Sequence, residues 1–144
     1  MANVRAGWQG DYALGKHEFY AVYHFALQYS EWADRYQALG AQLKAQRYDT
    51  DKVQSSPTQS STVEDPAIER AELDGKMKIV EQAAQQADGD LSKYILKAAT
   101  TEGITYNYLQ QVMMIPCGRD TYYKLRHKFY WLLSKKIKIS NQGT

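Results

Sequence analysis

The residues of this chain that are best suited to do chemistry are basic, and they gather near its C-terminal end. From Arg119 to residue 144 there are seven Lys and Arg residues and one acid, Asp120, which gives a local charge of +6. The whole chain carries a net charge of only +2, so its positive charge is concentrated here. Basic side chains interleaved with Tyr, Thr and His suit contacts to phosphates and a few base edges. The alternative is that these cations only favour the C-terminal end of a helix dipole.

A helix from Arg119 to about Lys138 is predicted to present these cations. Its apolar residues recur three and four positions apart and therefore share one face, formed by Tyr122, Leu125, Phe129 and Leu132 and widened by Leu133. The polar residues off that face or at its flanks form the predicted DNA-binding set. In this set we expect base reading from Arg119, Asp120, Thr121 and Tyr123, phosphate contacts from Lys124, Lys128, Lys135 and Lys136, and a flanking contact from His127.

A shorter helix is predicted just upstream, from Thr105 to Met113. It must end before Pro116, because proline cannot donate a helical hydrogen bond and disfavours helical geometry in the residue before it. Gly118 then frees the backbone for re-entry into the longer helix. A short helix, a turn and a longer helix are the outline of a helix-turn-helix, whose second helix can enter the DNA major groove.

Three motifs in this region also carry a family resemblance. They are Glu102-Gly103-Ile104-Thr105-Tyr106, the run from Ile115 to Tyr123, and the aromatic tail Phe129-Tyr130-Trp131-Leu132-Leu133. Through them, residues 64–138 resemble the phage late-gene and autolysin regulators of the RinA/ArpU type and, more distantly, region 4 of bacterial sigma factors. The resemblance implies a regulator that works beside RNA polymerase at a promoter for late or lytic genes. The turn departs from the usual pattern, because it is longer than three or four residues and has Met113-Met114 near the expected glycine.

Residues 1–48 are predicted to form a helical N-terminal arm. Apolar and aromatic residues recur at helical spacing over 16–47, and Ser30 could cap a second helix that starts at Glu31. These residues form a stripe along the helix that is too wide for the interface of a two-stranded coiled coil. The stripe therefore packs in a core or forms a homodimer or partner surface. Residues 49–63 are a linker by composition, rich in Ser, Thr and Gln.

The third predicted unit, residues 64–144, is the helix-turn-helix DNA-binding domain. Asp65-Pro66 is a helix start, with a capping carboxylate followed by proline in the first turn. That helix runs to Gln86 or Ala87, and residues 64–90 hold eight acids and three bases, a local charge of −5. A short helix follows from Leu91 and ends by Gly103. No segment alternates as a strand does, so the fold class is all-α.

Several function classes lack their sequence signals. There is no Gly-rich phosphate loop, and the three histidines lack metal-ligand spacing with the single cysteine, Cys117. We therefore expect no enzyme activity, no cofactor and no metal. No apolar run has the length of a signal peptide, and none approaches the ~20 residues of a membrane span. These features, with a lone cysteine that fits a reducing compartment, predict a cytoplasmic protein that does not enter a membrane.

The sequence as a whole predicts a sequence-specific transcriptional regulator, phage or prophage encoded. Its expected partners are double-stranded DNA and RNA polymerase, with a homodimer through residues 16–47 as the alternative use of the aromatic stripe. Two other functions remain open. One is a small terminase-like subunit of a phage DNA-packaging machine, which also joins a helix-turn-helix to an oligomerising helical region. The other is a helical adaptor that holds a protein through its tyrosine-rich faces and binds no DNA.

Overall fold

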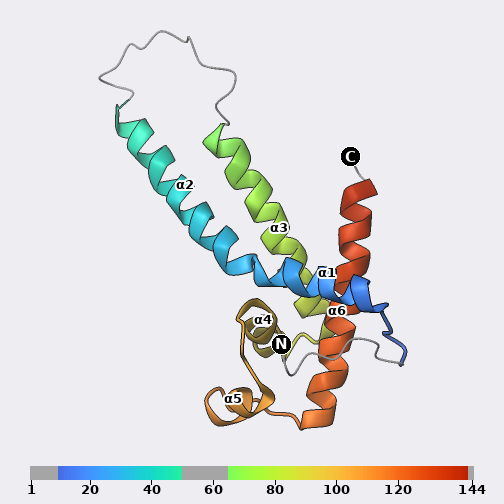
Figure 1. Ribbon diagram of the computed structural model, residues 1–144. Helices are drawn as coiled ribbons and strands as arrows, with labels where there is room; N and C mark the ends of the chain where they lie inside the picture. Colours follow the sequence, from blue (N-terminus) through green and yellow to red (C-terminus); the bar gives the residue numbers. More distant parts are fainter. Residues whose placement is uncertain (1–9, 50–64, 143–144) are drawn as a thin grey trace.

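The computed structural model describes residues 10–49 and 65–142, and within these ranges every regular element is a helix (Figure 1). The protein is therefore all-α, as predicted. Apart from Asp49, the predicted linker at 49–63 lies outside the described residues. No helix in the described ranges combines the length and the apolar character that crossing a membrane requires. The helices are α1 (Lys16–Leu27), α2 (Tyr29–Asp49), α3 (Pro66–Ala87), α4 (Ser92–Thr100), α5 (Tyr106–Gln111) and α6 (Arg119–Gln142).

The N-terminal helical segment is broken once, as its sequence suggested. The break lies at Gln28, so α2 begins at Tyr29, two residues before the predicted start at Glu31. The Tyr29 hydroxyl donates a hydrogen bond to the Glu81 carboxylate and so fixes the break against α3. Burial, together with this bond, raises the pKa of Tyr29 to about 12. The tyrosine therefore stays a hydrogen-bond donor at any physiological pH.

Helices α2 and α3 form a hairpin-like pair that runs side by side (Figure 1). The start of α3 matches the prediction, because the Asp65 side chain accepts a hydrogen bond of 2.8 Å from the Ala67 N–H. Trp32 and Leu39 of α2 are buried in the shared core. On the exposed side the pair is joined by an ion pair between Arg35 and Glu69 at 2.9 Å. Because this ion pair is exposed, it contributes less than the apolar contacts beneath it.

One glycine allows α2 and α3 to approach closely. The Arg70 guanidinium lies 3.8 Å from the ring centroid of Tyr36, and its Nε donates to the Tyr36 carbonyl at 3.1 Å. A Cβ atom on Gly40 would lie only 2.7 Å from Arg70 Nη2. Any larger residue at position 40 would therefore displace Arg70 from α2. Gly75 of α3 differs, because nothing lies within 4 Å of its would-be Cβ.

Helix α6 packs against α3 and is crossed by α1 (Figure 1). Phe129, Tyr130 and Leu133 of α6 are at most 1% exposed, and the Phe19 ring of α1 packs against Tyr130 at 5.2 Å. The Glu18 carboxylate accepts a hydrogen bond from Ser134 at 2.7 Å at the same crossing. The aromatic stripe of residues 16–47 therefore packs on the core of its own chain, which favours the core alternative over a dimer surface.

The predicted apolar face of α6 is wrong in part. Tyr122, Phe129 and Leu133 are buried, but Leu125 and Leu132 are only half-buried. Further buried residues lie outside the predicted face: His127, Tyr130 and Ser134. The reason is that α6 packs against α3 on one side and α1 on the next, so it buries a wider arc than a helix with a single neighbour.

Phe129 and Leu125 of α6 should respond differently to truncation to alanine. We expect Phe129→Ala to lower the free energy of unfolding by about 3–5 kcal/mol, because the side chain is fully buried. Leu125→Ala should cost less than about 2 kcal/mol, because its side chain is already half-exposed. Urea unfolding followed by circular dichroism measures both. Equal losses would contradict the packing of α6 described above.

The two helical glycines form a second matched pair. Gly75→Ala should stabilise the protein by roughly 0.5–1 kcal/mol, because alanine has the higher helix propensity and the site is open. Gly40→Ala should give no such gain, because it displaces Arg70 and its contacts with Tyr36. Thermal melts of both variants test this, and a gain at both positions would show that the Arg70 contacts contribute nothing.

Candidate nucleic-acid interface

Helices α4 and α5 lie beside the N-terminal end of α6 (Figure 1). The chain turns at Gly103, whose φ of 85° is readily adopted by glycine, and enters α5. Thr105 caps α5 by accepting a hydrogen bond of 3.2 Å from the Tyr108 N–H. The predicted helix over 105–113 is therefore present but shorter, since it ends at Gln111. Leu109 is fully buried and holds this short helix in the core.

The turn between α5 and α6 occupies residues 112–118. Met114, with a φ of 57°, takes the left-handed conformation that a glycine usually provides, at a cost of about 1–2 kcal/mol. The turn is closed by a hydrogen bond of 3.0 Å from the Ile115 N–H to the Leu109 carbonyl. Ile115 is buried, whereas Val112 and Met114 are 61% and 78% exposed. The turn thus places apolar side chains on the surface.

Tyr106 connects α5 to the start of α6. Its hydroxyl donates a hydrogen bond of 2.6 Å to the Cys117 carbonyl, and its ring lies 5.7 Å from the Tyr122 ring. Burial raises the pKa of the Cys117 thiol above its usual range, with a smaller contribution from Asp88. A raised pKa keeps the thiol protonated and unreactive, so the residue acts here through its backbone.

The first turns of α6 present most of the predicted base-reading residues. Arg119, Asp120 and Thr121 are exposed, whereas Tyr123 is half-buried with its ring 5.0 Å from that of Tyr122. Arg119 points toward α5, where its Nη2 donates to Asn107 Oδ1 at 3.2 Å. These residues therefore occupy the tip of α6 but do not form a single flat face.

Three lysines follow one another along the face of α6 that α1 and α3 leave uncovered. We define Lys124, Lys128 and Lys135 as the lysine ridge, because their spacing of four and seven residues aligns them on one side of the helix. Lys124 and Lys135 are exposed and Lys128 is half-exposed. Neither Lys124 nor Lys128 forms an ion pair with an acid in the described part of the chain. Lys135 differs, because its Nζ lies 4.6 Å from the Trp131 ring centroid. Lys124 and Lys128 are therefore the ridge cations most available to an anionic partner.

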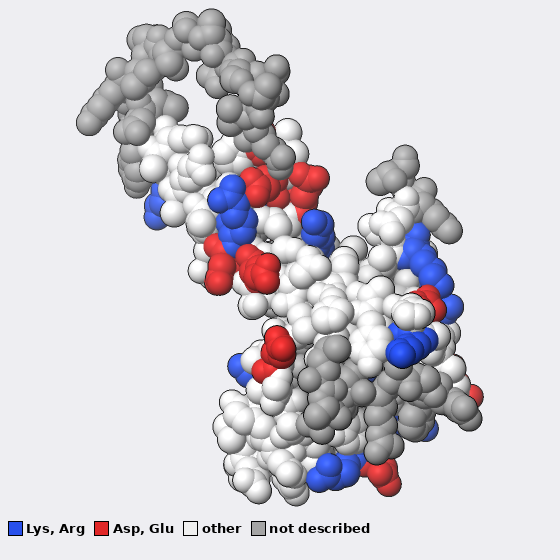
Figure 2. All heavy atoms as spheres, in the orientation of Figure 1, with Lys and Arg blue, Asp and Glu red and all other residues white. Residues whose placement is uncertain are grey.

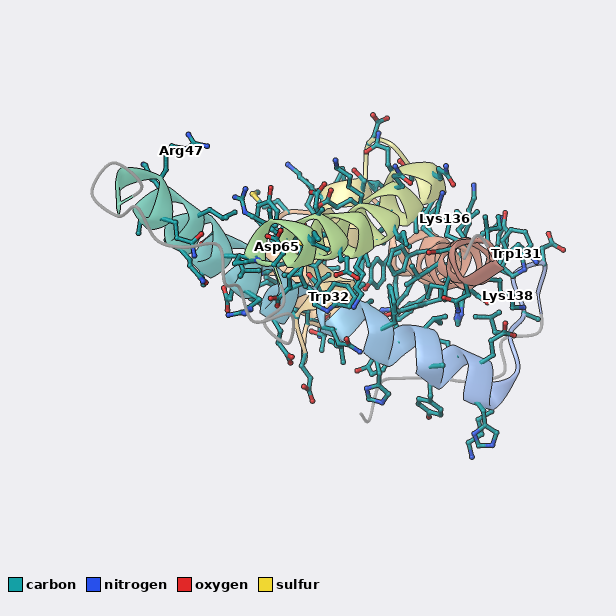
Figure 3. The ribbon with its side chains drawn as sticks, turned by 90° about the horizontal axis from the view of Figure 1, so that it is seen from above. Trp32, Arg47, Asp65, Trp131, Lys136 and Lys138 are labelled. Atoms are coloured by element: carbon teal, nitrogen blue, oxygen red, sulfur yellow. The ribbon has the colours of Figure 1, made fainter. Side chains whose placement is uncertain are left out.

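The remaining cations near the end of α6 lie off this ridge. Lys138 forms an ion pair with Glu18 at 2.8 Å, on the side that faces α1. Lys136 is half-buried, and Figure 3 shows it on the opposite side of α6 from Lys138. In Figure 2 basic atoms lie along the outer edge of α6, and acidic and basic atoms are interspersed over the α2–α3 pair. The predicted phosphate contact from Lys136 therefore belongs to another surface than the ridge.

His127 does not belong to the interface that the sequence predicted for it. The residue is only 6% exposed, because it falls within the arc of α6 that the neighbouring helices cover. Burial lowers its pKa to about 4, and the Arg126 charge acts in the same direction. A neutral, buried imidazole can neither meet a phosphate nor reach a base. We therefore remove His127 from the candidate DNA-binding set.

A polar groove of about 560 Å³ lies elsewhere, where α1, α2 and the end of α4 meet. Two carboxylates, Glu31 and Glu102, line it beside His24 and Thr101, so it is poorly suited to phosphate. Within the described ranges no group of three or more His, Cys, Asp or Glu residues could hold a metal ion. The groove therefore adds no further candidate for an anion or metal site.

Comparisons of the chain with protein-family models, with curated proteins and with solved structures found no match. The likeness to RinA/ArpU-type regulators therefore depends only on the motifs in residues 102–133.

The buried His127 should make stability depend on pH. The unfolded chain binds its proton near pH 6.5, whereas the folded protein resists protonation down to about pH 4. In that window the unfolded state holds more protons, so the free energy of unfolding should fall by roughly 1–3 kcal/mol as the pH drops. His127→Gln should remove this part of the slope, whereas His17→Gln, at an exposed position of α1, should not. Urea unfolding at several pH values measures the slope of the free energy of unfolding against pH. Identical slopes in both variants would show that the His127 imidazole is accessible to solvent.

Proposed function

We propose that this chain is a double-stranded DNA-binding transcriptional regulator that inserts the tip of α6 into the major groove. The observation that carries the proposal is the lysine ridge on the uncovered face of α6, next to an exposed tip that holds Arg119, Asp120 and Thr121. Ridge cations would neutralise phosphates and release counterions, and tip residues would meet base edges. Most acids of residues 65–87 belong to α3, whereas Asp88 lies close enough to Cys117, beside the start of α6, to act on its pKa.

The connection between α5 and α6 supports the same proposal. A short helix, a closed turn and a long helix follow one another, and the short helix is held in place by buried Leu109 and by Tyr106. In a helix-turn-helix the first helix supports the second, which protrudes far enough to enter the groove. We interpret α5, residues 112–118 and α6 as this unit. Met114, in its left-handed conformation, supplies the turn geometry that glycine gives elsewhere.

The biological context of the proposal comes from the resemblance to RinA/ArpU-type regulators. On that basis we propose a phage or prophage regulator of late or lytic genes that works beside RNA polymerase. We propose binding without catalysis, in the cytoplasm, where both the duplex and the polymerase are found.

A protein-binding adaptor is the second candidate function. The observation in its favour is the exposure of Val112 and Met114 beside Tyr108, which is 38% exposed. Exposed apolar side chains that cluster on one loop often mark a protein contact. The two functions differ in one measurable respect, since only the regulator binds duplex DNA with a strong dependence on salt.

A charge deletion on the ridge tests the proposal. Lys128→Ala should weaken binding about equally for all duplex sequences and reduce the salt slope by roughly one unit, because one phosphate contact is lost. Lys44→Ala makes the same charge change at an exposed position of α2 and serves as the matched control. The measurement is a titration of labelled duplexes at several salt concentrations, with folding checked by circular dichroism.

Two outcomes would count against the proposal. If the parent protein binds no duplex at low salt, the proposed regulator function is contradicted and the adaptor becomes the better explanation. If Lys44→Ala reduces the slope as much as Lys128→Ala, the protein binds DNA through its general charge and the ridge is not the contact surface.

A further inference from the structure

Arg119 is held by two residues of α5. Its Nη2 donates to Asn107 Oδ1 at 3.2 Å, and its guanidinium carbon lies 5.1 Å from the ring centroid of Tyr106. Tyr106 is itself fixed, because it is 5% exposed and its hydroxyl bonds to the Cys117 carbonyl at 2.6 Å. The guanidinium therefore rests on a rigid ring and is tied at one nitrogen.

The remaining donors of Arg119 face solvent, because the residue as a whole is exposed. A guanidinium has five N–H donors in a planar fork, and Asn107 takes one of them. Fixing one nitrogen of a flexible side chain lowers the entropy that must be lost when the other donors bind a ligand. The arrangement thus preorganises the free donors of Arg119 at the tip of α6.

We propose that Asn107 is a positioning residue that aims Arg119 at a guanine in the major groove. The inference rests on the proposed function, and it names the base that the tip reads. A guanidinium can donate two parallel hydrogen bonds to O6 and N7 of guanine, which is a planar contact. Asn107 acts through Arg119 and need not touch the DNA.

A guanine suits Arg119 better than a phosphate does, for two reasons. The ridge lysines already supply cations for phosphate, and Arg119 points away from them toward α5. A phosphate presents acceptor oxygens in several directions and gains little from a guanidinium whose plane is fixed. A base edge presents its acceptors in one plane, so a fixed plane improves both affinity and selectivity.

The experiment first selects duplexes from a random-sequence pool with the parent protein. The enriched duplex and its single base-pair changes are then titrated against Arg119→Ala, Asn107→Ala and the double variant. Asn107→Asp keeps the acceptor oxygen, and Gln110→Ala removes an exposed amide from the same helix as a matched control. Circular dichroism checks the folding of each variant.

We expect Arg119→Ala to lower the preference for one G·C pair by roughly 5- to 150-fold. Asn107→Ala should lower the preference at that same pair by about 2- to 12-fold with the salt slope unchanged, because only the preorganisation of Arg119 is lost. The double variant should lose no more than Arg119→Ala alone. Asn107→Asp should restore the preference even where its charge weakens overall binding, and Gln110→Ala should match the parent.

Other outcomes overturn the inference in distinguishable ways. If the parent protein binds no duplex, both the proposed function and this inference are refuted. A parent that binds duplexes with no enriched G·C pair, or an Asn107→Ala variant that matches the parent, leaves the function standing and refutes the positioning role. Additive losses in the double variant would show that Asn107 acts independently of Arg119.

Discussion

The burial of α6 between two helices is the constraint on which the rest of the structure depends. Phe129, Tyr130 and Leu133 occupy the centre of the core, with α3 on one side of them and α1 on the other. Because both neighbours are needed to cover this arc, α1 must return to α6 from the far end of the sequence, and α2 follows it to pack on α3. The two sides of the undescribed residues 50–64 therefore share one hydrophobic core.

The same constraint decides which residues of α6 remain available to a partner. Two neighbouring helices leave one uncovered side along the length of α6, and that side carries the lysine ridge. The buried arc instead takes in His127 and Ser134, which no apolar pattern would assign to a core. Ser134 is accommodated there through its hydrogen bond with Glu18, so a polar residue on α6 becomes part of the contact with α1.

Local signals predicted the helices well, because each depends on residues that are close in sequence. Asp65-Pro66 gave the start of α3, and Pro116 with Gly118 gave the break before α6. The burial of His127 and the half-exposure of Leu125 could not be predicted in this way. Both depend on how the neighbouring helices are arranged around α6, and no periodicity within residues 119–138 contains that information. The hydrogen bond between Asn107 and Arg119 was missed for a similar reason, since it depends on the orientation of α5.

The ion pair between Lys138 and Glu18 limits the number of cations that the proposed DNA surface can offer to phosphates. Once α1 has neutralised Lys138 and Arg119 is assigned to a guanine, the ridge offers three cations for phosphates: Lys124, Lys128 and Lys135. Each phosphate contact contributes about −0.9 to the salt exponent on B-DNA, so the ridge of one chain contributes at most about −2.7. The ridge itself spans eleven residues, or about 16 Å of helix. So small a footprint gives modest non-specific affinity, which means that occupancy of a particular operator must come from base contacts, from a second copy on an adjacent half-site, or from a polymerase already bound there.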